Sequence, residues 1–472
     1  MIRTARISAI ALAVSVGWAL PVQAQSSESA AIQQELAAMR AQIDKLENRV
    51  NSLEGRVQQE KTRADAAEAR AAAAASAPAA AASSAPAQAK AEKPAPEITF
   101  DGAPKIATAD GWSFKPRGRL QVDAAGVNAP SGIAPATSDS LGFGTEFRRA
   151  YMGFDGTMPG GFAYRLEADF ANSSVDLTDL YLSYKANRDI TLTVGQHKPF
   201  WGLEEMTSDL FTSFMERAAF NSAFGFERRV GVSAVYLDKR FLVQGGVFTD
   251  NAADLNSDKN NSYSFDGRVI FMPTIGDGQL HVGGSIHVRD FNDQSTTTRY
   301  RARPFVHTAD VRLVDTGNIT ATGENSMGLE LAYVNGRLHG TAESHWIKAR
   351  RPDLKDPLFN GGYVELGYLL TDDKTAYRGG AYDRIRPKNP VSAGGIGAIQ
   401  LNARYDWLDL NDAGIIGGNQ QIAGASVLWI PMDYVRLIFN YGHLWIEDSP
   451  VAAGTDRNYQ ADALGVRAQL DF

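Results

Sequence analysis

Cysteine is absent from this chain of 472 residues, which excludes disulfides, thiolate nucleophiles and zinc-thiolate sites. Common enzyme motifs are missing as well: there is no G-x-S-x-G turn, no H-E-x-x-H pair, no Walker A loop and no EF-hand loop. The histidines are scattered, and His281 and His287, which lie on the same predicted lumenal face, would be about 20 Å apart. We therefore predict no enzymatic activity, no catalytic residue, no metal site, no cofactor and no nucleic-acid partner.

Long apolar runs are also scarce. The run from Ile7 to Leu20 follows two arginines and precedes small residues up to Ala24, which is typical of a secretory signal peptide over residues 1–24. It is too short to cross a hydrocarbon core of about 30 Å. The mature protein is therefore expected outside the cytoplasm, and it can cross a membrane only as a closed β-barrel.

The chain does contain alternating strands, most clearly at its end. Residues 463–472 place Leu464, Val466 and Leu470 on one face and Arg467 on the other, because strand side chains point to alternate faces. Such a strand suits a sandwich of two sheets in water or an outer-membrane barrel. The terminal Phe472 resembles the signal read by the bacterial barrel-assembly machinery, which we predict as a partner.

Sixteen alternating segments follow residue 112. They cover residues 113–125, 145–157, 161–172, 176–187, 189–197, 229–237, 240–249, 263–273, 279–291, 325–335, 337–348, 361–372, 396–409, 419–430, 433–446 and 459–472. The connections alternate between tight turns such as Asn335-Gly336 and long loops such as 198–228 and 292–324, as in barrels with short periplasmic turns. The sequence thus predicts an all-β fold, a 16-stranded antiparallel transmembrane β-barrel over residues 112–472 in the bacterial outer membrane.

Two regions fit this scheme less simply. The segment from Ile422 to Ile430 is ambiguous as to which face is apolar. The connection 373–395 should be a periplasmic turn, yet it is 23 residues long, and loops of that length usually have a function. We predict that this turn folds inward and narrows the pore; alternatively, it lies over the barrel mouth.

The segment before the barrel has a different period. From Ile32 to Val57, apolar residues recur at two heptad positions with charges of both signs between them, which predicts a periplasmic α-helical coiled coil within residues 25–70. A single amphipathic helix docked on a core is the alternative, but it would show a wider apolar stripe. Residues 71–111, rich in Ala, Ser and Pro, are interpreted as a linker.

Arginine recurs on the predicted inner faces of the strands. A charge facing lipid at the midplane would cost about 2–4 kcal/mol, so these arginines indicate which face is the lumen, where guanidinium groups suit phosphate and carboxylate. The connections 289–314 and 372–395 each carry five basic against three acidic residues, whereas 198–228 is net acidic. The two basic connections are candidates for a constriction; the alternative is solvated loops with incidental charge. Residues 97–472 carry a net charge of −9, but charge at the narrowest point decides selectivity.

Seven motifs carry a family resemblance. They are RRAYMGFDG at 148–156, GQHKPF at 195–200, SFMER at 213–217, RARP at 301–304, DTG at 315–317, RP at 386–387 and ARYDWLDLND at 403–412. Together they resemble the phosphate-selective porin O and P family. The resemblance implies a trimeric 16-stranded porin in which two outer loops and one long periplasmic turn fold into the lumen, and in which arginine and lysine side chains conduct phosphate or polyphosphate.

We therefore predict a homotrimer in outer-membrane lipid that passes small hydrophilic solutes, chiefly anions such as phosphate, by passive diffusion. The alternatives are a general or cation-preferring porin, a plugged barrel that tethers the envelope, and a barrel-borne hydrolase with a Ser and His pair at its rim. The candidate pore-lining and anion-binding residues are Arg149, Arg165, Lys198, Arg217, Arg289, Arg299, Arg301, Arg303, Lys374, Arg378, Arg384, Arg386, Lys388, Arg404 and Arg436.

Overall fold

The computed structural model describes Thr62 and residues 95–133, 141–225, 227–255, 262–291 and 297–472. The chain divides into two units, residues 1–91 and 92–472, and every described strand belongs to the second. The predicted signal peptide and the heptads of the predicted coiled coil lie outside the described residues, as does most of the predicted linker.

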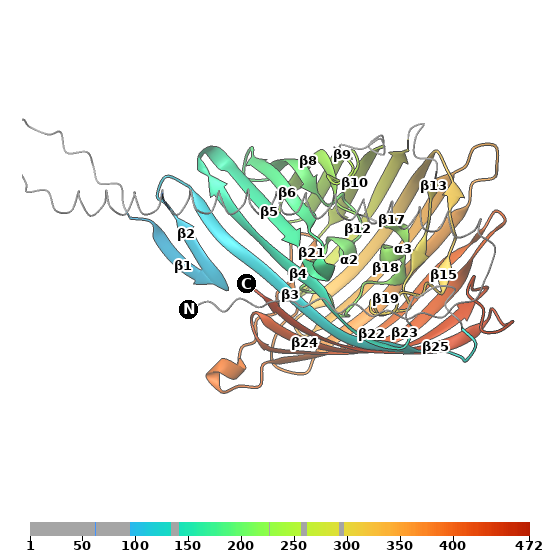
Figure 1. Cartoon of the computed structure of the whole chain (residues 1–472). Coiled ribbons are helices and arrows are strands. Elements are labelled where there is room, and N and C mark those ends of the chain that lie inside the picture. The colour runs from blue at the N-terminus through green and yellow to red at the C-terminus, as the bar shows by residue number, and fades with distance from the viewer. Residues whose placement is uncertain (1–61, 63–94, 134–140, 226, 256–261, 292–296) are drawn as a thin grey trace, which may run out of the picture. The chain divides into compact units, whose positions relative to one another are not determined.

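Sixteen antiparallel strands form a closed barrel in the second unit (Figure 1). They are β3 (Ser113–Asn128), β4 (Phe143–Met158), β5 (Phe162–Asp169), β6 (Asp176–Lys185), β7 (Ile190–His197), β8 (Arg229–Leu237), β9 (Phe241–Phe248), β10 (Tyr263–Phe271), β12 (Gly278–Asp290), β17 (Gly323–Asn335), β18 (Leu338–Arg350), β19 (Leu358–Leu369), β22 (Ala398–Asp412), β23 (Ile415–Met432), β24 (Val435–Glu447) and β25 (Tyr459–Asp471). Each strand pairs with the next along the chain, and β25 pairs with β3. This last pairing removes the free edges of the sheet, and the predicted 16-stranded barrel is confirmed.

Strand boundaries differ from the sequence predictions by at most four residues, at the start of β23. One turn is shifted along the chain. Asn335 pairs with Leu338, so the two-residue loop is Gly336-Arg337 rather than Asn335-Gly336. Gly336 has a φ of +56°, a left-handed conformation that glycine adopts at little cost.

The strands bury alternate residues. In β25, Leu464 on the outer face is 64% exposed, whereas Arg467 on the inner face is completely buried. The ambiguous segment in β23 has apolar residues on its inner face: Ile422 and Leu428 are buried in a cluster with Phe214 of an inward-folded loop. Apolar side chains therefore face inward there because a loop covers them.

Two strands precede the barrel. β1 (Glu97–Asp101) and β2 (Ala103–Ala107) form an antiparallel hairpin, and β2 pairs briefly with β3. The sequence analysis assigns this stretch to the linker that ends at residue 111, so the structure places regular strands in the last part of that segment. The sequence signal, alternation over five residues of β1, is short.

The remaining elements lie in the connections. They are η1 (Pro159–Gly161), η2 (Ala171–Ser173), α2 (Leu203–Met206), α3 (Ala219–Phe224), β11 (Thr274–Ile275), β13 (Thr297–Thr298), β14 (Arg301–Ala302), β15 (Val314–Asp315), β16 (Ile319–Thr320), β20 (Ala376–Arg378), β21 (Ala381–Asp383) and η3 (Val391–Ala393). None of the described helices has the length and apolar character that crossing a membrane requires.

Candidate functional site

Glu204 of α2 joins the connection 198–228, called the helical loop, to the barrel wall. Its carboxylate forms an ion pair with Arg404 of β22 and accepts hydrogen bonds from the Ala218 amide at 2.9 Å and from the Asn221 side chain at 2.8 Å. Arg404 also pairs with Glu365 of β19 at 2.7 Å, and it is 4% exposed. Because Arg404 is buried, removing it would leave the Glu204 and Glu365 carboxylates without their counter-charge. Arg404 therefore anchors the helical loop to the barrel wall.

Two further arginines of the wall hold the middle of the helical loop. Arg467 of β25 donates to the Met215 carbonyl oxygen and pairs with Glu216 at 2.7 Å. Arg436 of β24 is buried and donates to the Thr212 carbonyl oxygen at 3.0 Å. Both guanidinium groups are therefore engaged with the helical loop.

The hairpin β20–β21, here called the turn hairpin, belongs to the long connection between β19 and β22. The Tyr377 hydroxyl lies 2.5 Å from His281 Nδ1 on β12, and Arg268 of β10 donates to the Gly380 carbonyl oxygen at 3.0 Å. His281 and Arg268 face the inside of the barrel, so the turn hairpin contacts the inner wall.

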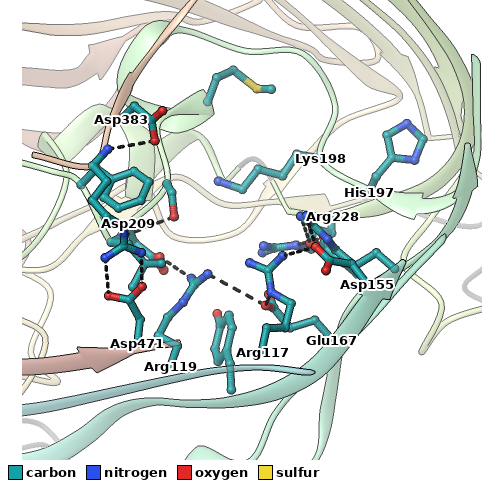
Figure 2. A pocket seen from close by; sticks show the side chains of 18 of the residues that line it. Arg117, Arg119, Asp155, Glu167, His197, Lys198, Asp209, Arg228, Asp383 and Asp471 are labelled. Atoms are coloured by element: carbon teal, nitrogen blue, oxygen red, sulfur yellow. Dashed lines mark hydrogen bonds and ion pairs between the residues drawn. The ribbon is translucent and has the colours of Figure 1, made fainter. Parts of the chain in front are cut away.

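A cavity of about 850 Å³ lies inside the barrel (Figure 2), between the helical loop, the turn hairpin and the wall. We call it the inner cavity. Eleven basic side chains line it: Lys115, Arg117, Arg119, Arg149, Arg165, Lys198, Arg217, Arg228, Arg378, Arg384 and Arg386. Eight acidic side chains face them: Asp101, Asp155, Glu167, Asp179, Glu205, Asp209, Asp383 and Asp471.

Single carboxylates in the inner cavity serve two arginines each. Asp209 pairs with Arg119 and, at 2.5 Å, with Arg149. Burial alone would raise the pKa of Asp209, but these two arginines hold it well below its usual range. Asp155 likewise pairs with two arginines, Arg165 at 3.2 Å and Arg117 at 3.3 Å, and Figure 2 labels Asp155 and Arg117. Because basic side chains outnumber acidic ones in the inner cavity, part of the positive charge stays uncompensated.

A second cavity of about 600 Å³, the outer cavity, lies between the helical loop and residues 297–322, here called the arginine loop. It is lined by Arg148, Arg149, Arg217, Arg301, Arg303 and Arg312 against Glu205, Glu216, Glu227 and Asp406. Burial, together with Arg303 and Arg301, lowers the pKa of Arg312 to about 10. Arg301 is exposed and forms no ion pair with any described residue.

Four residues line both cavities: Arg149, Tyr151, Glu205 and Arg217. Lys198 lies beside them, with its Nζ atom 2.5 Å from a Glu205 carboxylate oxygen. Burial lowers the pKa of Lys198 to about 8, although Glu205 opposes this shift. The two cavities thus meet at a cluster of three basic residues, one tyrosine and one carboxylate.

The predicted site residues fall into four groups. The inner cavity is lined by Arg149, Arg165, Lys198, Arg217, Arg378, Arg384 and Arg386, and the outer cavity by Arg301 and Arg303 together with the shared Arg149 and Arg217. A smaller side cavity is lined by Arg289 and Arg299. The others line none of these three cavities: Lys374 and Lys388 are exposed, and Arg404 and Arg436 are buried against the helical loop.

The structure adds lining residues that the predicted set does not contain. The additional arginines are Arg117, Arg119, Arg148, Arg228 and Arg312. The sequence could have added Arg117 and Arg119 to the set, because both fall on the inward-facing side of the alternation in β3. The ring of Tyr151, 4.7 Å from the Arg119 guanidinium carbon, carries no such signal, because tyrosine occurs on both faces of a barrel strand. In the described ranges, no three His, Asp or Glu side chains are placed to hold a metal ion.

Comparisons with known proteins agree with this architecture. The family model for phosphate-selective porin O and P matches residues 114–472. The chain is 43% identical over 385 residues to an uncharacterized protein of Caulobacter vibrioides, covering 80% of this chain and 77% of that protein. It is 27% identical over 352 residues to Porin O of Pseudomonas aeruginosa, covering 68% and 78%. OmpT of Vibrio cholerae, folded in vitro, is similar in structure with a TM-score of 0.50 at 13% identity, covering 77% of this chain and 99% of OmpT; that likeness shows the fold alone.

Proposed function

Because the chain belongs to the phosphate-selective porin O and P family and is therefore an outer-membrane porin rather than an enzyme, we propose that it passes small anions, phosphate among them, by passive diffusion. The family match confirms the resemblance drawn from the sequence motifs. The preference for anions and the route through the two cavities are the parts that we propose.

The charge of the lumen is the observation that carries this proposal. The whole chain has a net charge of −7, yet basic side chains outnumber acidic ones by eleven to eight in the inner cavity and by six to four in the outer cavity. Field lines are focused inside a narrow cavity with low-dielectric walls. The sign of this local charge therefore favours anions inside a protein that is negative overall.

The proposed route runs from the outer cavity to the inner cavity past Arg149, Arg217 and Lys198. An anion entering the outer cavity meets Arg301, whose charge has no partner among the described residues. Forked guanidinium donors can replace part of the hydration that a phosphate or carboxylate loses in a narrow passage. Because the arginines are shared with carboxylates, binding stays weak enough for release, and the solute gradient drives the flux.

The reversal potential of the protein in a planar bilayer tests the proposal. Under a tenfold KCl gradient we expect the sign that corresponds to chloride permeating faster than potassium. A reversal potential of the opposite sign would contradict anion preference and would favour the general or cation-preferring porin. Folded protein that never gives a stable single-channel current would favour the plugged barrel.

We propose the assembly from the sequence and the family together. The heptads from residue 32 to residue 57 suit a periplasmic coiled coil, and the proposed unit is a homotrimer in outer-membrane lipid. The terminal Phe472 suits recognition by the barrel-assembly machinery. Cross-linking of the full-length mature chain and of a form that lacks residues 25–70 tests whether the heptads contribute to the oligomer.

A further inference from the structure

We infer that the side cavity around Arg229 binds one small, singly charged oxyanion of the carboxylate type, such as acetate. This site lies beside the proposed permeation route, and its argument does not rest on that route. It would act as a structural site that joins loops to the barrel wall.

The side cavity has a volume of about 240 Å³ and is enclosed by the wall and three connections. Arg229 of β8, Arg289 of β12 and Glu324 of β17 contribute from the wall. The end of α3, Asn251 and residues 298–300 contribute from the loops. A ligand in this cavity would therefore contact three connections at once.

Arg229 is a buried cation without a direct partner among the described residues. It is 5% exposed, and among the described residues it donates no hydrogen bond and forms no ion pair; its Nη1 atom is buried without a partner. The preceding Arg228, by contrast, pairs with Asp179 at 2.6 Å. Burial removes the hydration of a guanidinium group, so leaving it unpaired is costly. Arg229 therefore offers an uncommitted positive charge to a ligand.

The other two arginines of the side cavity are committed to carboxylates. Arg289 pairs with Asp250 at 2.8 Å, and Arg299 pairs with Asp315 at 2.5 Å. Arg229 is thus the cation of this cavity that forms no ion pair in the described part of the chain, and it could accept one singly charged anion.

Four acidic residues line the side cavity, and none of them forms an ion pair with Arg229: they are Glu227, Asp250, Asp254 and Glu324. Glu324 accepts a hydrogen bond from the Tyr300 hydroxyl at 2.7 Å. Glu227 is exposed and Asp254 is half-buried, and neither forms an ion pair with Arg229. These carboxylates disfavour a second negative charge in the cavity, which argues against a doubly charged ligand.

The chemistry of the guanidinium group defines the ligand class. Its planar, forked donors fit the two oxygens of a carboxylate better than they fit a single spherical ion. Gly225 and Glu227 line both the side cavity and the outer cavity, so a small anion in the lumen has a neighbouring point of entry. Once bound, it would hold α3, Asn251 and residues 298–300 against the wall, so that binding should raise stability.

Thermal unfolding of the full-length protein in detergent tests the site. Sodium acetate is titrated while a bulky organic sulfonate keeps the ionic strength constant. We expect the unfolding temperature of the wild type to rise and to saturate with acetate. In Arg229→Gln the apparent affinity should fall at least tenfold, whereas Arg188→Gln, on an exposed turn away from the cavities, should behave as the wild type. No saturable rise in the wild type, or the same rise in Arg229→Gln, would overturn the inference.

Two more comparisons keep the test sharp. Without acetate, Arg229→Gln should be at least as stable as the wild type, because it removes an uncompensated buried charge; lower stability would show that Arg229 already has a partner. Arg229→Lys keeps the charge but loses the fork, so it should bind acetate more weakly and chloride as the wild type does. Equal midpoints for acetate and chloride in the wild type would overturn the assignment to a carboxylate.

Discussion

Lys198 is the basic residue at the meeting point of the cavities whose charge can change near neutral pH. Because burial lowers its pKa to about 8, the side chain is charged at pH 6.5 and neutral at pH 9.5. We expect the ratio of anion to cation permeability to fall as the pH rises through about 8. Measuring the reversal potential at several pH values between 6.5 and 9.5 tests this prediction.

The matched control for Lys198 is Lys198→Arg, which keeps a positive charge over the whole range. This variant should show a flat pH profile. If its selectivity falls with pH as in the wild type, the titrating group is a different one.

Arg301 permits a substitution with little structural cost, since it is exposed and unpaired among the described residues. A unit charge roughly 10 Å from a permeating ion in water is worth about 0.4 kcal/mol, or about a twofold effect. Arg301→Gln should therefore lower the permeability ratio about twofold in dilute salt and leave stability unchanged. Arg188→Gln, on the tight turn between β6 and β7, is the control, and an equal effect there would refute a local role for Arg301.

Among the elements, the helical loop depends on its anchors. Arg404→Met would leave Glu204 and Glu365 without their shared partner, and breaking a buried ion pair costs about 3–5 kcal/mol. We expect the free energy of unfolding in urea to fall by about that amount and the single-channel current to become noisier. The control is Arg188→Met, because Arg188 pairs with Asp189 at an exposed turn. This variant should change neither the free energy of unfolding nor the current noise. An unchanged free energy of unfolding in Arg404→Met would mean that the loop is held by other contacts.

The turn hairpin is expected to narrow the periplasmic half of the lumen. Replacing residues 376–383 with a short Gly-Ser linker removes Arg378 and Asp383 from the lining of the inner cavity. Single-channel conductance should increase, because the passage is wider, while anion preference should persist through Arg149 and Arg217. A conductance equal to that of the wild type would show that the turn hairpin does not restrict the passage.

The strands could be predicted from the sequence, whereas the contacts between the loops and the barrel wall could not. The sixteen strands could be predicted because each exposes one face to lipid, and this leaves an alternation that can be followed over eight or more residues. The inward apolar residues Ile422 and Leu428 were ambiguous because their partner, Phe214, lies more than two hundred positions earlier in the chain. For the same reason the sequence could place arginines on the inner face, but it could not separate Arg404, which anchors a loop, from Arg149, which lines both cavities.

At the scale of the whole molecule, selectivity should depend on ionic strength. The Debye length falls from about 10 Å at 0.1 M salt to about 3 Å at 1 M, so the field of the lining charges reaches less of the passage in concentrated salt. We expect the permeability ratio measured under a fixed tenfold gradient to approach that of free diffusion as total salt rises. A ratio that stays constant would assign selectivity to size exclusion or to tight binding.

The position of Arg467 connects assembly to leakage. It pairs with Asp123 of β3 at 2.7 Å across the closing seam and also donates to the Met215 carbonyl oxygen of the helical loop. Arg404 and Arg436 hold the same loop from β22 and β24, so all three anchors come from the last four strands of the chain. A barrel that has not yet paired β25 with β3 would thus lack three of the contacts that hold the helical loop, so closing the seam and fixing this loop in the lumen should be coupled.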